Sequence, residues 1–97
     1  MTETILKEVA QKFALTEQQV VEEGVKAFLQ AQLHYIEIER QQIFAKFGVH
    51  SLEDLDSYIN IHPDKETDIL PELQRADYLT SRKNDLAKLM SELNGND

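Results

Sequence analysis

The chain opens with apolar residues at three- and four-residue spacing, which is typical of one face of a helix. This face spans residues 3–13 and contains Ile5, Leu6, Val9, Ala10 and Phe13. The pattern breaks at "FALTEQQ", where Thr16 can cap a new helix and Gln19, three residues later, can complete a capping box. We therefore predict a short N-terminal helix and a second helix that begins at about Glu17.

The second predicted helix is very long. From Glu17 to about Phe47 the chain has no proline and only one glycine, Gly24, and 1.5 Å per residue gives a length of roughly 45 Å. One apolar face, interrupted by Arg40, contains Leu29, Leu33, Ile36, Ile43 and Phe47; the nearly opposite face contains Phe28, Ala31, Tyr35, Ile38 and Ala45. A helix with two apolar faces must be covered on both. We expect the rest of the chain to cover the first face, and a homodimer or another protein to cover the second.

The stretch "KFGVHSLEDLDSY" (residues 46–58) predicts a helix end and a new helix start. Gly48 fits the left-handed position that ends a helix, followed by the hydrophobic Val49. Ser51 fits an N-cap, and the carboxylates of Glu53 and Asp54 suit the positive end of a helix dipole. We expect a short acidic helix over about 52–60.

Residues 60–68 then indicate a polar connector. A last helix is predicted from Pro71 to about Leu93, because proline is favoured in the first turn of a helix. Its apolar stripe contains Leu73, Ala76, Leu79, Leu86, Met90 and Leu93, with Lys83 at an otherwise apolar position. The predicted fold is all-α, with one very long central helix against which the short acidic helix and the C-terminal helix pack back. We expect one helical domain over 1–97, divided into dimerising scaffold helices (1–50), acidic helix and linker (51–70) and C-terminal helix (71–93).

Two charged residues, Arg40 and Lys83, interrupt otherwise apolar stripes. Either their aliphatic stems pack while the charges reach solvent, or they fix register and oligomeric state, as polar residues do in coiled-coil cores. With Arg40 included, the residues that we assign to dimerisation are Phe28, Ala31, Tyr35, Ile38 and Arg40.

Charge changes this picture. The chain has 10 basic and 18 acidic residues and a net charge of −8, and residues 51–77 hold 8 acidic and 2 basic residues. Such a charge argues against nucleic acid or an anionic membrane as a partner and favours a basic protein.

No apolar run is long enough for a membrane span or a signal peptide, so we expect a cytoplasmic protein. The absence of cysteine excludes disulfides and thiolate catalysis.

Candidate catalytic and metal-binding groups are sparse. His34–Glu37 and His50–Glu53 have i, i+3 spacing, but di-iron helical bundles use the reverse order, Glu-x-x-His, with further inward carboxylates. The chain has no glycine-rich phosphate loop and no Ser/His/Asp pattern, and its carboxylates cluster in polar sequence. We predict neither enzymatic activity, nor a metal, nor a cofactor.

The acidic segment alternates carboxylates with apolar residues. Charges of this kind can steer a basic partner, and apolar groups can stabilise the complex, although a solvated surface is the alternative interpretation. The predicted partner-binding residues are Leu52, Glu53, Asp54, Leu55, Asp56, Tyr58, Ile59, Asp68, Ile69, Leu70 and Leu73.

Two stretches resemble known antitoxins. "LKEVAQKFALTEQQVVEEGVKAFLQ" (residues 6–30) resembles the paired helices of ribbon-helix-helix proteins, common among type II antitoxins, through Val20, Val21, Gly24 and the pair Phe28–Leu29. "FAKFGVHSLEDLDSYI" (residues 44–59) is similar to the corner of small bacterial and archaeal antitoxin-like proteins, in which an acidic linker and a final helix follow. The resemblance implies a dimerising helix pair and neutralisation of a basic toxin, for example a ribonuclease.

One feature of that class is missing. Ribbon-helix-helix proteins read DNA with a polar, usually basic strand, whereas here only "MTET" precedes Ile5. A helix-turn-helix over residues 16–24 would present glutamates to phosphates. We therefore do not expect the chain alone to bind DNA. The predicted function is that of a non-enzymatic, antitoxin-like protein-binding module; the alternatives are a small self-assembling structural or adaptor protein and, third, a DNA-binding regulator.

Overall fold

The computed structural model describes residues 2–95, and every regular element among them is helical. The order is α1 (Thr2–Lys12), α2 (Glu17–Lys46), α3 (Leu52–Ile61), a 3₁₀ turn η1 (Pro63–Lys65) and α4 (Glu66–Leu93). The described chain is elongated, with extents of 61 × 28 × 18 Å. The predicted all-α fold with one very long helix is confirmed. No helix in the described part of the chain is both long and apolar enough to cross a membrane.

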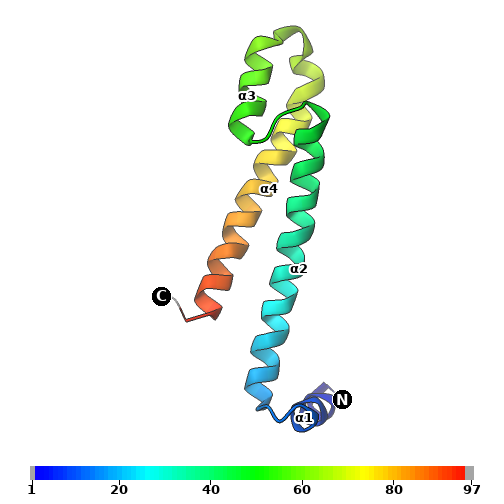
Figure 1. Cartoon of the computed structure of the whole chain (residues 1–97), viewed down its shortest axis with the longest axis vertical. Coiled ribbons are helices and arrows are strands. Elements are labelled where there is room, and N and C mark those ends of the chain that lie inside the picture. Colours follow the sequence, from blue (N-terminus) through cyan, green and yellow to red (C-terminus); the bar gives the residue numbers. More distant parts are fainter. Residues whose placement is uncertain (1, 96–97) are drawn as a thin grey trace.

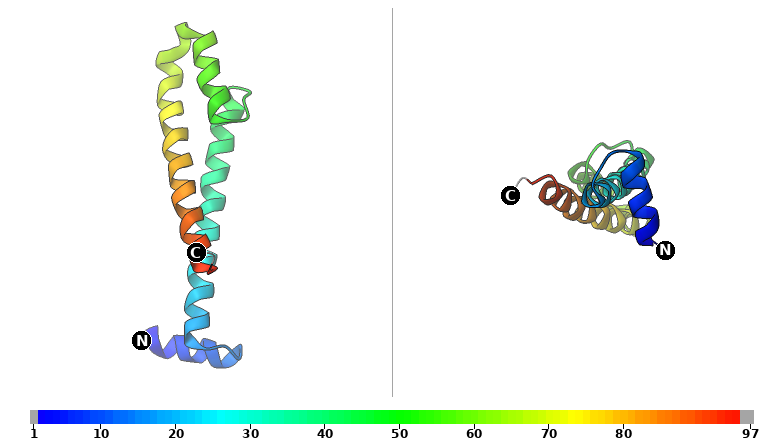
Figure 2. Two further views of the ribbon diagram at one scale, coloured as in Figure 1. Left: turned by 90° about the vertical axis from the view of Figure 1, so that its left-hand side faces the viewer. Right: turned by 90° about the horizontal axis from the view of Figure 1, so that it is seen from below.

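The helices form a long antiparallel hairpin with a third helix at one end (Figure 1). α4 runs back alongside α2, as predicted, and α3 lies at the end where the two are joined, where it packs mainly against α4 rather than against the long helix. At the other end α2 continues beyond the C-terminal end of α4 (Figures 1 and 2). α1 lies across that end of α2, on the side opposite the C-terminal end of α4.

Local chemistry sets the helix termini as predicted. The Thr16 hydroxyl accepts a hydrogen bond from the Gln19 amide (3.0 Å), and the Gln19 side chain accepts one from the Thr16 amide (2.8 Å), which completes the capping box. Gly48 has φ +64°, and the Val49 amide donates to the carbonyl of Phe44 (3.0 Å), as in a Schellman motif. The Ser51 hydroxyl caps α3 by accepting from the Asp54 amide (3.1 Å).

The predicted start of the last helix at Pro71 is wrong. α4 begins at Glu66, and Pro71 lies inside it. The proline that starts this region is Pro63, at the first position of η1. The extra turn is stabilised because it places Ile69 in the core, where the side chain is 2% exposed. Pro71 cannot bond the Thr67 carbonyl, but both residues are exposed, so water can hydrate this group. Residues 66–70 are therefore helix and not linker.

The core lies at the end of the hairpin that carries α3. It contains buried residues from three helices: Ile43, Phe44, Leu55, Ile59, Ile69, Ala76 and Leu79. Phe44 and Leu55, 1% and 0% exposed, are the most deeply buried large side chains together with Ile69. Outside this cluster only Ala10 and Leu29 are buried among the described hydrophobic residues.

The two apolar faces of α2 differ in burial, as the sequence predicts. The first face packs toward α4: Leu29 and Ile43 are buried, and Ile36 and Phe47 are half-buried. The second face is left uncovered by residues 2–95, with Phe28 62% and Tyr35 64% exposed.

Candidate protein-binding site

A groove between α3 and α4 is the best candidate site in the acidic segment. Its volume is about 370 Å³, and its walls are Leu52, Glu53, Asp56, Leu73, Gln74 and Asp77. The two walls repeat one pattern, a leucine followed by a polar residue and, three positions later, an aspartate: "LEDLD" on α3 and "LQRAD" on α4. Because i and i+3 side chains share a helix face, each helix presents one leucine and two polar groups to the groove.

The carboxylates of this groove form no ion pair within the described chain. None of Glu53, Asp56 and Asp77 forms an ion pair among residues 2–95. The nearby basic side chain of Arg75 bonds to α2 instead. Arg75 forms two hydrogen bonds with the Glu39 carboxylate, from Nε to Oε2 (2.6 Å) and from Nη2 to Oε1 (3.0 Å). The carboxylates of the groove therefore stay unpaired within the described chain.

The neighbouring contacts between α2 and α4 are ion pairs at the surface. Lys46 Nζ lies 2.8 Å from Glu72 Oε1. The hydrogen bond from Arg75 lowers the pKa of Glu39, and Glu39 in turn raises the pKa of Arg75. These pairs help to align α2 with α4, although each exposed pair contributes little by itself.

The predicted partner-binding residues divide into three groups. Leu52, Glu53, Asp56 and Leu73 line the groove. Leu55, Ile59 and Ile69 are buried in the core, so we correct their assignment: they hold α3 and α4 together and are not available to a partner. The remaining four lie outside the groove: Asp54, Tyr58, Asp68 and Leu70.

Sequence reasoning missed Gln74 and Asp77 on the α4 wall. The repeated leucine–polar–aspartate pattern is present in the sequence, but it indicates a site only once α3 and α4 are known to lie side by side.

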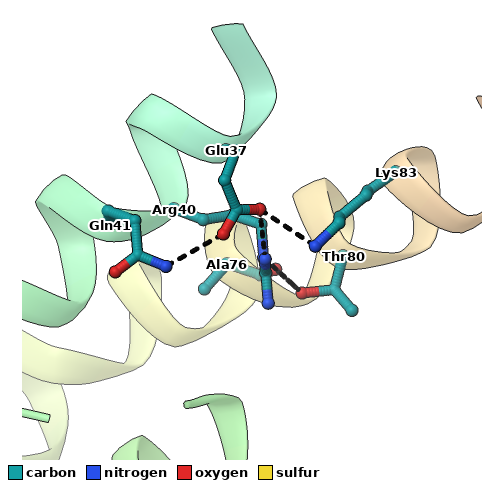
Figure 3. Close-up of polar contacts among 6 residues, drawn as sticks. All are labelled: Glu37, Arg40, Gln41, Ala76, Thr80 and Lys83. Atoms are coloured by element: carbon teal, nitrogen blue, oxygen red, sulfur yellow. Dashed lines mark hydrogen bonds and ion pairs between the residues drawn. The ribbon is translucent and has the colours of Figure 1, made fainter. Parts of the chain in front are cut away.

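Glu37 forms the polar centre of the α2–α4 contact (Figure 3). Its Oε2 accepts from Arg40 Nη1 (2.6 Å) and lies 3.1 Å from Lys83 Nζ, while Oε1 accepts from Gln41 Nε2 (2.9 Å). The hydrogen bond from Gln41 is the largest cause that lowers the pKa of Glu37 to about 2; burial opposes it, and Lys83 and Arg40 add to it. Sequence reasoning considered Glu37 only as a candidate metal ligand beside His34 and missed this role.

Arg40 joins α2 to α4 and is removed from the predicted dimerisation face. Its Nε donates to Thr80 Oγ1 (3.0 Å), and the Thr80 hydroxyl donates to the carbonyl of Ala76 (2.8 Å). The guanidinium lies 5.3 Å from the centre of the Phe44 ring, and the side chain is only 12% exposed. Both interrupting charges, Arg40 and Lys83, thus pair with Glu37 within one chain.

The described residues offer little for metal binding or for the ribbon of a ribbon-helix-helix protein. Nowhere in residues 2–95 do three His, Asp or Glu side chains gather as metal ligands. α1 begins at Thr2, so the described residues before α2 contain no strand that could form such a ribbon.

Fold and groove together define a class: an all-α helical hairpin with a three-helix core and an acidic groove at one end. The chain belongs to the family described as "Uncharacterized protein MJ0235 family", whose model matches residues 1–97. Searches among curated proteins and among solved structures found no match. The family description carries no activity or partner, so the antitoxin interpretation stays a prediction.

Proposed function

We propose that this chain is a non-catalytic protein-binding module whose α3–α4 groove takes a basic segment of another protein. One observation carries the proposal: Glu53, Asp56 and Asp77, none with an ion-pair partner in the described chain, surround the side chains of Leu52 and Leu73. This combination suits a lysine or arginine, whose aliphatic stem packs on leucine while its charged end reaches carboxylates.

The surrounding charge supports the same partner class. Residues 51–77 carry a net charge of −6, and in the described chain only one of their acidic side chains, Glu72, is in an ion pair. Such a field accelerates encounter with a positively charged surface, and contacts to the two leucines slow dissociation.

Antitoxin-like neutralisation is the form of this function that we favour. A ribonuclease toxin binds RNA largely through basic residues that contact phosphates. Carboxylates on the same basic residues would compete with RNA and inhibit the enzyme. Support for this step comes from the resemblance of residues 6–30 and 44–59 to antitoxins.

The test is co-expression and co-purification with the product of the adjacent reading frame, which the proposal expects to be basic. A groove variant, E53Q/D56N/D77N, removes three carboxylates from the groove. A matched control, D64N/E66Q/D68N, removes three exposed carboxylates elsewhere in the same segment and changes the net charge equally. We expect the parent chain and the control to form the complex and the groove variant to lose at least tenfold in affinity.

Three results count against the proposal. They are no complex with the parent chain, equal loss of affinity in both variants, and an affinity that does not fall as salt is raised, since screening weakens contacts between exposed charges. Equal loss would mean that net charge and not the groove determines binding. The exposed face of α2 favours a second role, self-association, which is independent of the groove.

A further inference from the structure

The exposed face of α2 follows a strict seven-residue repeat. Counting from Val21, one set of positions recurs every seven residues, and a second set recurs from Gly24. The first set is Val21, Phe28, Tyr35 and Gln42; the second is Gly24, Ala31, Ile38 and Ala45. All eight residues are exposed, and none is charged. We call this set the α2 seam. Two interleaved positions per seven residues are the pattern with which helices pair in coiled coils.

The two sets differ in size. Phe28, Tyr35 and Gln42 make the first set mostly large, whereas Gly24, Ala31 and Ala45 make the second mostly small. Helices pack well when large residues face small ones, so that successive layers are filled evenly. A parallel pair would place Phe28 against Phe28 and Gly24 against Gly24. Layers with too much side-chain volume would then alternate with layers that are nearly empty.

We infer that the α2 seam binds a second copy of this chain in the antiparallel direction. An antiparallel pair centred near residue 33 places each residue of one set opposite a residue of the other. Val21 then faces Ala45 of the second copy, Phe28 faces Ile38, and Tyr35 faces Ala31. Gly24 faces Gln42. In three of these four pairings a small side chain faces a larger one, and in the fourth the large Phe28 faces Ile38.

Electrostatics selects the same direction. Each chain carries a net charge of −6 in residues 51–77, at the α3 end of the hairpin. A parallel pair would bring the two acidic ends together. The antiparallel pair separates them by about 40 Å along the helix axis, several times the Debye length of about 8 Å at physiological ionic strength. Repulsion between the acidic ends is therefore screened only in the antiparallel arrangement.

The structure leaves the α2 seam accessible. α4 covers the opposite face of α2 through Leu29, Ile36 and Ile43. α1 lies across the end of α2 and leaves the eight seam residues exposed. The acidic groove between α3 and α4 is formed by other residues, so the inference does not depend on the proposed function.

The test compares two single substitutions by sedimentation equilibrium. Ala31→Glu places a charge in the middle of the α2 seam, and Gln30→Glu places the same charge one residue away, at an exposed position outside it. For the parent chain and for Gln30→Glu we expect a mass of twice 11.2 kDa, and for Ala31→Glu a mass of 11.2 kDa with unchanged helicity. A parent chain that stays monomeric up to about 1 mM, or two variants with the same mass, overturns the inference.

Disulfide cross-linking tests whether the two α2 helices pair in the antiparallel direction. The chain lacks cysteine, so only the introduced cysteines can form disulfides. Chains with Val21→Cys are mixed with chains with Ala45→Cys and oxidised. The antiparallel seam predicts disulfides between the two kinds of chain. Disulfides that form mainly between two Val21→Cys chains would show a parallel pair and overturn the inference.

Discussion

The two ends of this molecule use their apolar residues in opposite ways. We call residues 43–79 the head and residues 2–38 the foot. Of the nine buried hydrophobic residues in the described chain, seven lie in the head. Of the twelve large hydrophobic residues that are exposed, eight lie in the foot. The head therefore buries its own apolar surface, whereas the foot leaves such surface exposed.

The number of helices at each end explains the difference. In the head α2, α3 and α4 meet, so each can turn its apolar face toward a common core. In the foot α4 lies beside only part of α2, and beyond the end of α4 only α1 lies across α2. Two or fewer neighbours cannot cover a helix that is apolar on two faces. Exposed apolar patches on such a surface commonly mark interaction sites, which is why the foot and not the head is the expected place of self-association.

The sharpest test of this contrast is the same substitution at both ends. Phe44→Ala in the head removes a side chain that is 1% exposed, and Phe13→Ala in the foot removes one that is 71% exposed. We expect Phe44→Ala to lower the free energy of unfolding by about 3–5 kcal/mol and Phe13→Ala to change it by less than about 0.5 kcal/mol. Urea unfolding followed by circular dichroism, with both variants made in the monomeric Ala31→Glu chain, measures the two values. Similar losses would show that the foot has a core of its own.

The next largest effect concerns Glu37, where foot and head join. Its pKa is lowered from 4.5 to about 2, first by the hydrogen bond from Gln41. A lowered pKa means that this carboxylate stabilises the fold above pH 4.5 and that the contribution is lost as pH falls toward 2. Because the side chain is 37% exposed, solvent screening reduces the contribution to about 1 kcal/mol. We expect Glu37→Gln to cost this amount at pH 7 and nothing near pH 2.

Urea unfolding between pH 7 and pH 2 tests this pH dependence. Glu23→Gln is the control, because Glu23 is exposed on the same helix and forms no ion pair or hydrogen bond through its side chain in the described chain. A loss in Glu37→Gln that stays constant with pH would assign the effect to packing and not to charge.

Helix termini could be predicted from the sequence because their causes are local. The capping box of Thr16 and Gln19, the left-handed Gly48 and the N-cap Ser51 each depend on residues a few positions away. The start of α4 could not be predicted in this way. It depends on the burial of Ile69 against distant helices, and this tertiary contact outweighs the preference of Pro71 for a helix start.

The charge of the candidate groove could be predicted from the sequence, but its shape could not. The charge count located the acidic segment, and Leu52, Glu53, Asp56 and Leu73 do line the groove. Periodicity alone cannot tell which apolar residues of a short helix face the core, so Leu55 and Ile59 were assigned to a partner.

The hydrogen-bond partner of Arg40 on α4 could not be predicted from the sequence either. Thr80 lies 40 positions away in the chain, and pairing the two residues requires the alignment of α2 with α4.

The last prediction compares one glycine of the head with one glycine of the foot. Gly48, at the corner of the head, has φ +64°, a conformation that side chains with a Cβ rarely adopt. Gly24, in the foot, is inside α2, and a Cβ there would meet nothing within 4 Å. We expect Gly48→Ala to destabilise the monomeric Ala31→Glu chain by about 1 kcal/mol and Gly24→Ala to stabilise it by up to about 1 kcal/mol. Thermal unfolding of both variants measures whether each substitution stabilises or destabilises the chain. A destabilising Gly24→Ala would mean that this part of the foot is already packed against another segment within one chain, and the α2 seam would then have no free surface at Gly24.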